Sequence, residues 1–190
     1  PELHLRLAAL LHDTGKPACR TTDKDGVSHF RGHPEASRAI AYATLKALKT
    51  PGKLCEEVCT LIRYHDERIK PDRVRIKKLL SRLGEKTFFD LLKLQKADIL
   101  SQNPKFYSRL ENQNRVYNMA REIIKEGTAL TVKDLKISGD DIVALGVKPG
   151  KEVGEILSGA LDMVVNEILR NDREMLLEYA ETVINKVKEG

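Results

Sequence analysis

Tryptophan is absent from this 190-residue chain, and aromatic residues make up only 5% of it. Long apolar runs are also missing: no stretch approaches the roughly 20 residues that a membrane-spanning helix needs, and no charged-then-apolar leader opens the chain. Hydrophobic residues nevertheless supply 41% and charged residues 32%, a balance typical of a soluble protein built from aliphatic helices. The composition argues against a strand-rich architecture and against a membrane partner, and it predicts an all-α fold.

Cysteine is scarce, with three residues in the chain. Cys55 and Cys59 lie four apart on one predicted helical face, and Cys19 stands alone. An odd count without the spacing of a disulfide framework indicates reduced, structural thiols. We therefore expect a cytoplasmic protein.

The spacing of apolar residues predicts a series of helices, separated by breaks that contain glycine or proline. They are expected at about 3–11, 34–48, 54–64, 74–83, 86–100, 106–126, 152–169 and 172–187. A polar segment at 18–32 is expected to be a long loop with a brief extended piece at 27–30, and loops of this length are usually functional or disordered. The texture becomes glycine-rich after the helix at 106–126. We therefore predict a main body at 1–127 and a smaller helical tail at 128–190.

Four of the five histidines lie at predicted helix ends or in the long loop, together with several aspartates; the set is His12, Asp13, His29, His33, His65, Asp66 and Asp98. Imidazole nitrogens and carboxylate oxygens suit divalent Mn, Fe, Co, Ni, Zn or Mg, whereas the cysteines lack the spacing of a thiolate zinc site. His12, His33, His65 and Asp98 fall on different helices or helix entrances. Because an antiparallel bundle can bring such positions to one end of its core, the pattern predicts a metal site.

Other interpretations of these residues remain open at this point. A single histidine at a helix end is most often solvated or part of a cap, although four in an ordered series weaken that interpretation. His12 and Asp13 are about 100° apart on a regular helix, so they can flank one ion, or Asp13 can bridge two. His29 and His33 are four apart, but Pro34 disfavours helix at His33. We predict His33 as a ligand and His29 as an outer or substrate-facing residue.

Four segments together, "LRLAALLHDTGKP", "HFRGHPEAS", "LIRYHD" and "LLKLQKADILSQNP", resemble the HD superfamily of metal-dependent phosphohydrolases. In particular they resemble the HD region of bacterial tRNA nucleotidyltransferases (CCA-adding enzymes) and related poly(A) polymerases. The resemblance continues through "LKISGDDIVALGVKPGKEVGEIL". It implies an HD-type helical bundle, with His12 and Asp13 as the namesake catalytic doublet and Asp98 as the distal aspartate. It also implies that His33 and His65 occupy positions that can hold a second ion.

The sequence departs from that family in two ways. HD families usually carry a further histidine on a helix before the doublet, and this chain begins too late to contain it. His4 is no substitute, because it lies eight residues before His12, or about 12 Å along one helix. The glycine-rich opening and paired aspartates of a nucleotidyltransferase head are also missing. We therefore expect an N-terminally truncated part of a longer enzyme, or a stand-alone relative, that does not add nucleotides by itself.

The resemblance implies hydrolysis of phosphomonoesters or 2′,3′-cyclic phosphodiesters at a nucleotide or RNA end, with a divalent metal ion as cofactor. Because phosphates are anionic, the candidate substrate contacts are basic or substrate-facing residues near the doublet, namely Lys16, Arg20, His29, Arg31 and Arg63. Each of these charges is individually more often a solvated loop residue.

A catalytically silent tRNA-binding body is the alternative function. Lys and Arg number 33 against 28 Asp and Glu, giving a net charge of +5, which fits an anionic partner without requiring one. The stretch "ALGVKPGKEVGEIL" resembles a helix-hairpin-helix, whose backbone N–H groups can meet a phosphate. Its predicted RNA contacts are Gly146, Lys148, Gly150 and Lys151. An ordinary helix–helix turn fits the same residues equally well.

Overall fold

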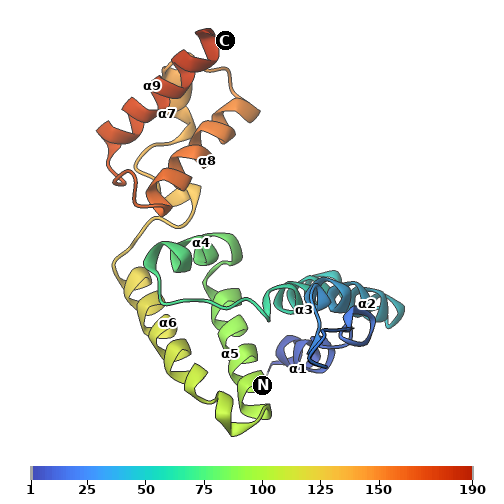
Figure 1. The fold of residues 1–190 in the computed structure, drawn as a ribbon. Helices are drawn as coiled ribbons and strands as arrows, with labels where there is room; N and C mark the ends of the chain where they lie inside the picture. Colours follow the sequence, from blue (N-terminus) through green and yellow to red (C-terminus); the bar gives the residue numbers. More distant parts are fainter. Residues whose placement is uncertain (1, 190) are drawn as a thin grey trace. The chain divides into compact units, whose positions relative to one another are not determined.

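The prediction of an all-α protein is confirmed by a computed structural model of the chain, which describes residues 2–189, with side chains as far as Lys186 (Figure 1). Within these residues the chain forms two compact units. The first contains the residues up to Ile69 together with Glu85–Tyr117, and the second contains Lys70–Gly84 with the residues from Asn118 onward. No helix in the described part of the chain is long and apolar enough to cross a membrane.

The first unit is built on four helices, α1 (Leu3–Leu11), α2 (His33–Ala47), α3 (Gly52–Tyr64) and α5 (Glu85–Ser101), and the start of α6 (Ser108–Lys125). Two 3-10 turns, η1 (Pro17–Cys19) and η2 (Pro104–Phe106), lie between them. The helix α3 packs against α1, α2 and α5 and so forms the centre of the unit. Its apolar positions recur at helical spacing and are buried: Cys55, Val58, Cys59, Leu61 and Ile62.

The long loop between α1 and α2 contains a small antiparallel ribbon. Its strands are β1 (Thr21–Thr22) and β2 (Ser28–His29), with Thr21 paired to His29 and Thr22 to Ser28. The extended piece expected at 27–30 is therefore present as β2. The ribbon closes through Asp23, whose side chain accepts hydrogen bonds from the backbone N–H groups of Asp25 and Val27.

The second unit contains α4 (Arg73–Leu83), the later part of α6, η3 (Val132–Asp134), α7 (Gly139–Ala144), α8 (Lys151–Val165) and α9 (Arg173–Glu189). Its apolar core is centred on α8 and α9, where Ala160, Leu176 and Ala180 are fully buried, and Ile142 of α7 is fully buried against them. The short α7 begins with a capping box: Asp141 N–H donates to the Ser138 hydroxyl, while the Asp141 carboxylate accepts from Ser138 N–H. Such a box satisfies backbone donors that a helix start leaves unpaired.

Candidate metal centre

The doublet His12-Asp13 lies where α1 ends. His12 N–H still donates to Ala8 O at 2.9 Å, but the chain then turns, with Lys16 N–H donating to Asp13 O at 3.0 Å. Leaving the helix at this point removes the angular separation of about 100° that a regular helix would impose on neighbours. As a result His12 Nε2 and Asp13 Oδ2 lie 3.3 Å apart and face the same space.

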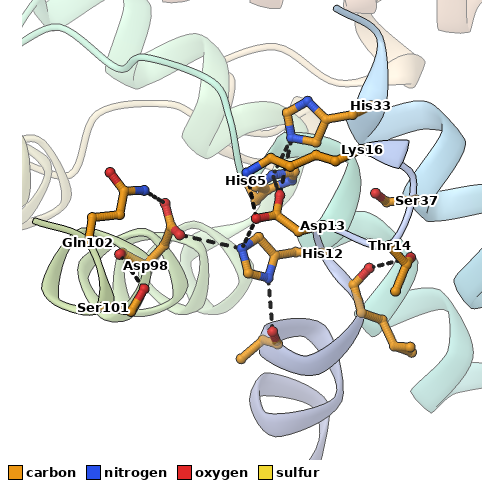
Figure 2. Close-up of polar contacts among 12 residues, drawn as sticks. His12, Asp13, Thr14, Lys16, His33, Ser37, His65, Asp98, Ser101 and Gln102 are labelled. Atoms are coloured by element: carbon orange, nitrogen blue, oxygen red, sulfur yellow. Dashed lines mark hydrogen bonds and ion pairs between the residues drawn. The ribbon is translucent and has the colours of Figure 1, made fainter. Parts of the chain in front are cut away.

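Three imidazole rings are held in one orientation by the same local contact. The Nδ1 atoms of His12, His33 and His65 lie 2.9, 2.8 and 2.6 Å from the backbone oxygens of Ala9, Phe30 and Ile62, each three residues earlier. A carbonyl can only accept a hydrogen bond, so each Nδ1 carries the proton and donates it. In the neutral form of each ring Nε2 therefore presents a lone pair, and Figure 2 shows these rings gathered around Asp13.

Asp13 occupies the centre of the cluster. Its Oδ1 lies 3.4 Å from His33 Nε2 and 3.6 Å from His65 Nε2, while its Oδ2 lies 2.6 Å from Lys16 Nζ. Asp98, on α5, places Oδ1 3.5 Å from His12 Nε2. The five residues predicted as ligands thus meet at one site in the first unit, although they come from four helices or helix ends (Figure 2).

The electrostatics of the cluster keep both carboxylates ionised. Burial opposes the charged form of Asp13, yet its contacts with His65 and Lys16 hold the pKa of this carboxyl well below its usual range. The contact with His12 lowers the pKa of Asp98. Burial likewise opposes protonation of His12, but Asp98, the Ala9 carbonyl and Asp13 together raise the pKa of His12. The site therefore offers negative charge to a cation at neutral pH.

Two observations show that the donor set fits a divalent ion. His12 Nε2 and Asp13 Oδ1 are buried without a hydrogen-bond partner among the described residues, and buried polar atoms are normally satisfied. His33 Nε2 and His65 Nε2 face each other at 3.1 Å, although both rings carry their proton on Nδ1. Lone pairs held this close repel each other unless a cation lies beside them. One ligand atom from each of His12, Asp13 and His65 lies within 4.8 Å of the others.

A close backbone contact fixes the turn that carries the doublet. Gly15 N–H donates to the buried Ser37 Oγ at 2.9 Å, and a Cβ at Gly15 would come within 2.5 Å of Ser37 N and 2.8 Å of Ala36 Cβ. Glycine is therefore required where this turn rests on the first turns of α2. Since α2 begins at His33, the contact ties the doublet to a third predicted ligand.

Two glutamines, Gln95 on α5 and Gln102 directly after its end, hold other predicted ligands in place. Gln95 Nε2 donates to the backbone oxygens of His65 and Glu67, at 3.0 and 2.9 Å. Gln102 Nε2 donates to Asp98 Oδ2 at 2.7 Å, which leaves Oδ1 directed at His12 (Figure 2). Ser37, Gln95 and Gln102 were not predicted as part of the site, although all three lie within the segments that carry the resemblance.

The predicted substrate contacts are placed differently from one another. Lys16 forms an ion pair with Asp13, the central residue of the cluster. His29 Nε2 instead contacts Asp23 Oδ2 at 2.7 Å within the ribbon, and Arg20 Nε donates to Ser28 Oγ. Arg63 lies 4.0 Å from Glu35, and Arg31 is exposed. Of these five, Lys16 alone has an ion pair with one of the five ligand residues in the described part of the chain.

His4, rejected as a ligand from its spacing, belongs to a separate buried cluster. Its Nε2 lies 2.9 Å from Asp90 Oδ2, and Lys86 and Lys93 contact the same carboxylate at 2.9 and 2.8 Å. The positions of Glu2, His4 and Asp90 would suit a metal ion geometrically, but the two ammonium groups already neutralise Asp90. This cluster is an ion-pair network.

The predicted RNA contacts lie in the second unit, where α7 is joined to α8. Gly146 and Gly150 adopt φ values of 94° and 147°, a region that favours glycine. Lys148 and Lys151 are exposed, and Lys151 pairs with Glu155 at 3.1 Å.

Comparison with known proteins identifies the family. Residues 33–180 match the family model for tRNA nucleotidyltransferase domain 2, and the chain belongs to this family. His33, His65 and Asp98 lie inside the matched range, and the doublet precedes it.

The chain is similar to curated proteins of the same kind. It is 34% identical to a CC-adding tRNA nucleotidyltransferase of Thermus thermophilus and 30% identical to an A-adding tRNA nucleotidyltransferase of Deinococcus radiodurans. These matches cover 84% and 82% of this chain, and 36% of each relative. A CCA-adding enzyme of Ligilactobacillus salivarius is 42% identical over 28% of this chain and 14% of its own length. The chain thus spans about a third of the length of the first two relatives. No solved structure matches it.

Proposed function

We propose that this chain is the body region of a tRNA nucleotidyltransferase-like protein and that it carries an HD-type, metal-dependent phosphohydrolase site. The expected substrates are phosphomonoesters or 2′,3′-cyclic phosphodiesters of nucleotides or RNA ends. The observation that carries the proposal is the convergence of three imidazole Nε2 atoms on Asp13, with His12 Nε2 and Asp13 Oδ1 buried and without a hydrogen-bond partner among the described residues. The main body at 1–127 and the tail at 128–190 remain proposed divisions of this region.

The roles of the residues follow from the contacts. His12, Asp13, His33, His65 and Asp98 would hold the metal, with the two oxygens of Asp13 facing different histidines. A divalent ion bound there would polarise phosphoryl oxygens and lower the pKa of a water molecule, so that hydroxide is available to attack phosphorus near neutral pH. Lys16, now on Asp13 Oδ2, would turn its ammonium group to a substrate phosphate. Arg20, His29, Arg31 and Arg63 remain further candidate phosphate contacts.

Elemental analysis of the purified protein tests the metal site. We expect a near-stoichiometric divalent transition metal or Mg in the wild type, and its loss in the His12→Ala, Asp13→Ala double variant. His29→Ala is the matched control, because it removes a nearby histidine that the structure pairs with Asp23. Equal metal content in the wild type and the double variant would contradict the proposal.

Hydrolysis is tested separately with the metal-loaded protein. Cyclic nucleotides, mononucleotides and aryl phosphates are the probes, and turnover should disappear with either His12→Ala or Asp13→Ala. If the protein binds metal but leaves all three substrate classes intact, the metal site stands and the proposed phosphohydrolase activity is contradicted.

We also propose that the chain binds tRNA, as the family membership and the net charge of +5 suggest. Gly146, Lys148, Gly150 and Lys151 are the expected contacts in the second unit. Binding should weaken with rising salt, as phosphate contacts do, and should survive loss of His12 and Asp13. A double Lys148→Glu, Lys151→Glu variant that binds tRNA like the wild type would remove these residues from the interface.

A further inference from the structure

A groove runs along the hairpin formed by α2 and α3, which lie side by side (Figure 1). Its volume is about 240 Å³, and its polar lining is Arg38, Tyr42, Lys46, Glu56, Thr60 and Arg63. The floor includes Cys55 and Cys59. Burial raises the pKa of the Cys59 thiol to about 11, so this thiol stays neutral and adds no negative charge to the floor.

Three polar residues of the groove lie in a line along α2. Arg38, Tyr42 and Lys46 are four residues apart in succession on α2, so they form one stripe about 12 Å long. Arg63 lies opposite on α3. The cations Arg38, Lys46 and Arg63 line the groove with one carboxylate, Glu56. Glu35 contacts both arginines at the end of the groove, so three cations meet two carboxylates and the excess positive charge that suits a phosphate lies at Lys46.

An exposed aromatic ring lies in the middle of this stripe. Tyr42 is 49% exposed, although large aromatic side chains are usually covered. Lys46 Nζ lies 5.6 Å from the centre of its ring. An accessible ring between two cations is the arrangement that single-stranded nucleic acids use, with bases on the ring and phosphates on the cations.

One end of the groove lies near the proposed metal centre. Arg38 is held by Glu35, and Arg63 lies 4.0 Å from the same carboxylate. Glu35 is two residues after His33 on α2, and Arg63 is two residues before His65 at the end of α3. The Arg38 and Arg63 end of the groove is therefore formed by the helix termini that carry two of the proposed ligands.

We propose that this groove binds single-stranded RNA, with phosphates on Lys46 and Arg38 and a base stacked on Tyr42. Strand binding itself is independent of the metal. We further propose that the end of the bound strand points toward Asp13, and this orientation rests on the proposed phosphohydrolase function.

The test is fluorescence anisotropy with a labelled single-stranded oligoribonucleotide at several salt concentrations. Tyr42→Ala should weaken binding by about fivefold or more, the lower bound for loss of one base–aromatic stack, while Tyr42→Phe keeps the ring and should bind like the wild type. Lys46→Glu should also weaken binding. The plot of log K against log salt should become less steep by about 0.7, as expected for one lost phosphate contact.

The control is Lys78→Glu, which makes the same charge change at an exposed lysine of α4 in the second unit. If Tyr42→Ala and Lys46→Glu weaken binding no more than Lys78→Glu does, the groove is not the RNA site. A labelled RNA duplex should lose little affinity with Tyr42→Ala, because its bases are already stacked, and an equal loss would overturn the single-strand assignment. Metal content measured on the same preparations should not change, which separates failure of this proposal from failure of the metal centre.

Discussion

His33 Nε2 and His65 Nε2 lie 3.1 Å apart, and each ring donates through Nδ1 to a backbone carbonyl. In their neutral forms the two rings therefore direct lone pairs at each other, and a cation beside them removes that repulsion. A metal ion should therefore stabilise the folded protein.

Metal addition should raise the free energy of unfolding by about 2.7 kcal/mol when the free ion is at 100 times its Kd. The measurement is thermal unfolding with EDTA and with saturating metal. In His65→Ala this gain should largely vanish, whereas His29→Ala should keep it. A wild-type melting temperature that is indifferent to every divalent ion tested would argue against the site.

Gly15→Ala should lower both stability and metal affinity. The added Cβ would meet backbone atoms of α2 that cannot rotate away, and overpacking of this kind costs about 1–3 kcal/mol. Ser37→Ala should cost a similar amount, since it leaves the Gly15 N–H buried without an acceptor. Urea unfolding and metal titration measure the two effects. Gly154→Ala is the control, because a Cβ at this position would meet nothing within 4 Å. This substitution should stabilise α8 by roughly 0.5–1 kcal/mol, since alanine favours a helix more than glycine does.

Gln102→Leu should weaken metal binding by about 10- to 100-fold, the range seen when a group that orients a ligand is removed. The variant frees Asp98 Oδ2 and lets the carboxylate rotate away from His12. Competition with a chromogenic chelator measures the affinity. Ser101→Ala, one residue away and bonded only to the backbone oxygen of Asp98, should bind metal normally. Equal affinities for the two variants would mean that Gln102 has no orienting role.

Acid should destabilise the first unit through Asp90. Burial opposes its ionisation, but Lys93, Lys86 and His4 lower the pKa of Asp90 to about 2. Because the folded-state pKa is depressed, this stabilisation is complete above about pH 4 and is lost as the pH falls toward 2. Its size is about 2 kcal/mol. Urea unfolding of the wild type should show this loss between pH 4 and 2, and Asp90→Asn should start lower and vary less with pH.

The helices and the meeting of the five His and Asp residues could be predicted because both leave local marks in the sequence. Apolar periodicity marks each long helix, and a histidine at the end of such a helix, as at His12 and His65, stands out against it. The contacts of Ser37, Gln95 and Gln102 could not be predicted, since a serine or glutamine on a helix carries no mark of what it will meet. His29 shows the reverse problem: its spacing from His33 suited a shared site, but a ribbon with Asp23 satisfies it locally.

The glycine-rich composition after residue 127 suggested a single division of the chain. The helix α7 in this region has six residues, which is too few to show apolar periodicity. The grouping of α4 with the C-terminal helices depends on contacts between segments far apart in sequence, such as Lys77 Nζ with Glu167 Oε1 at 2.7 Å. Apolar periodicity records which face of a helix is buried, but not which helix buries it.

The chain enters the second unit at Lys70, returns to the first at Glu85, and leaves it again after Tyr117. Neither unit is therefore a contiguous stretch of the gene. A deletion or exchange that uses one breakpoint between Lys70 and Tyr117 would divide the packing of at least one unit. Expression of either unit alone would require the segments to be rejoined in a new order or with a new loop.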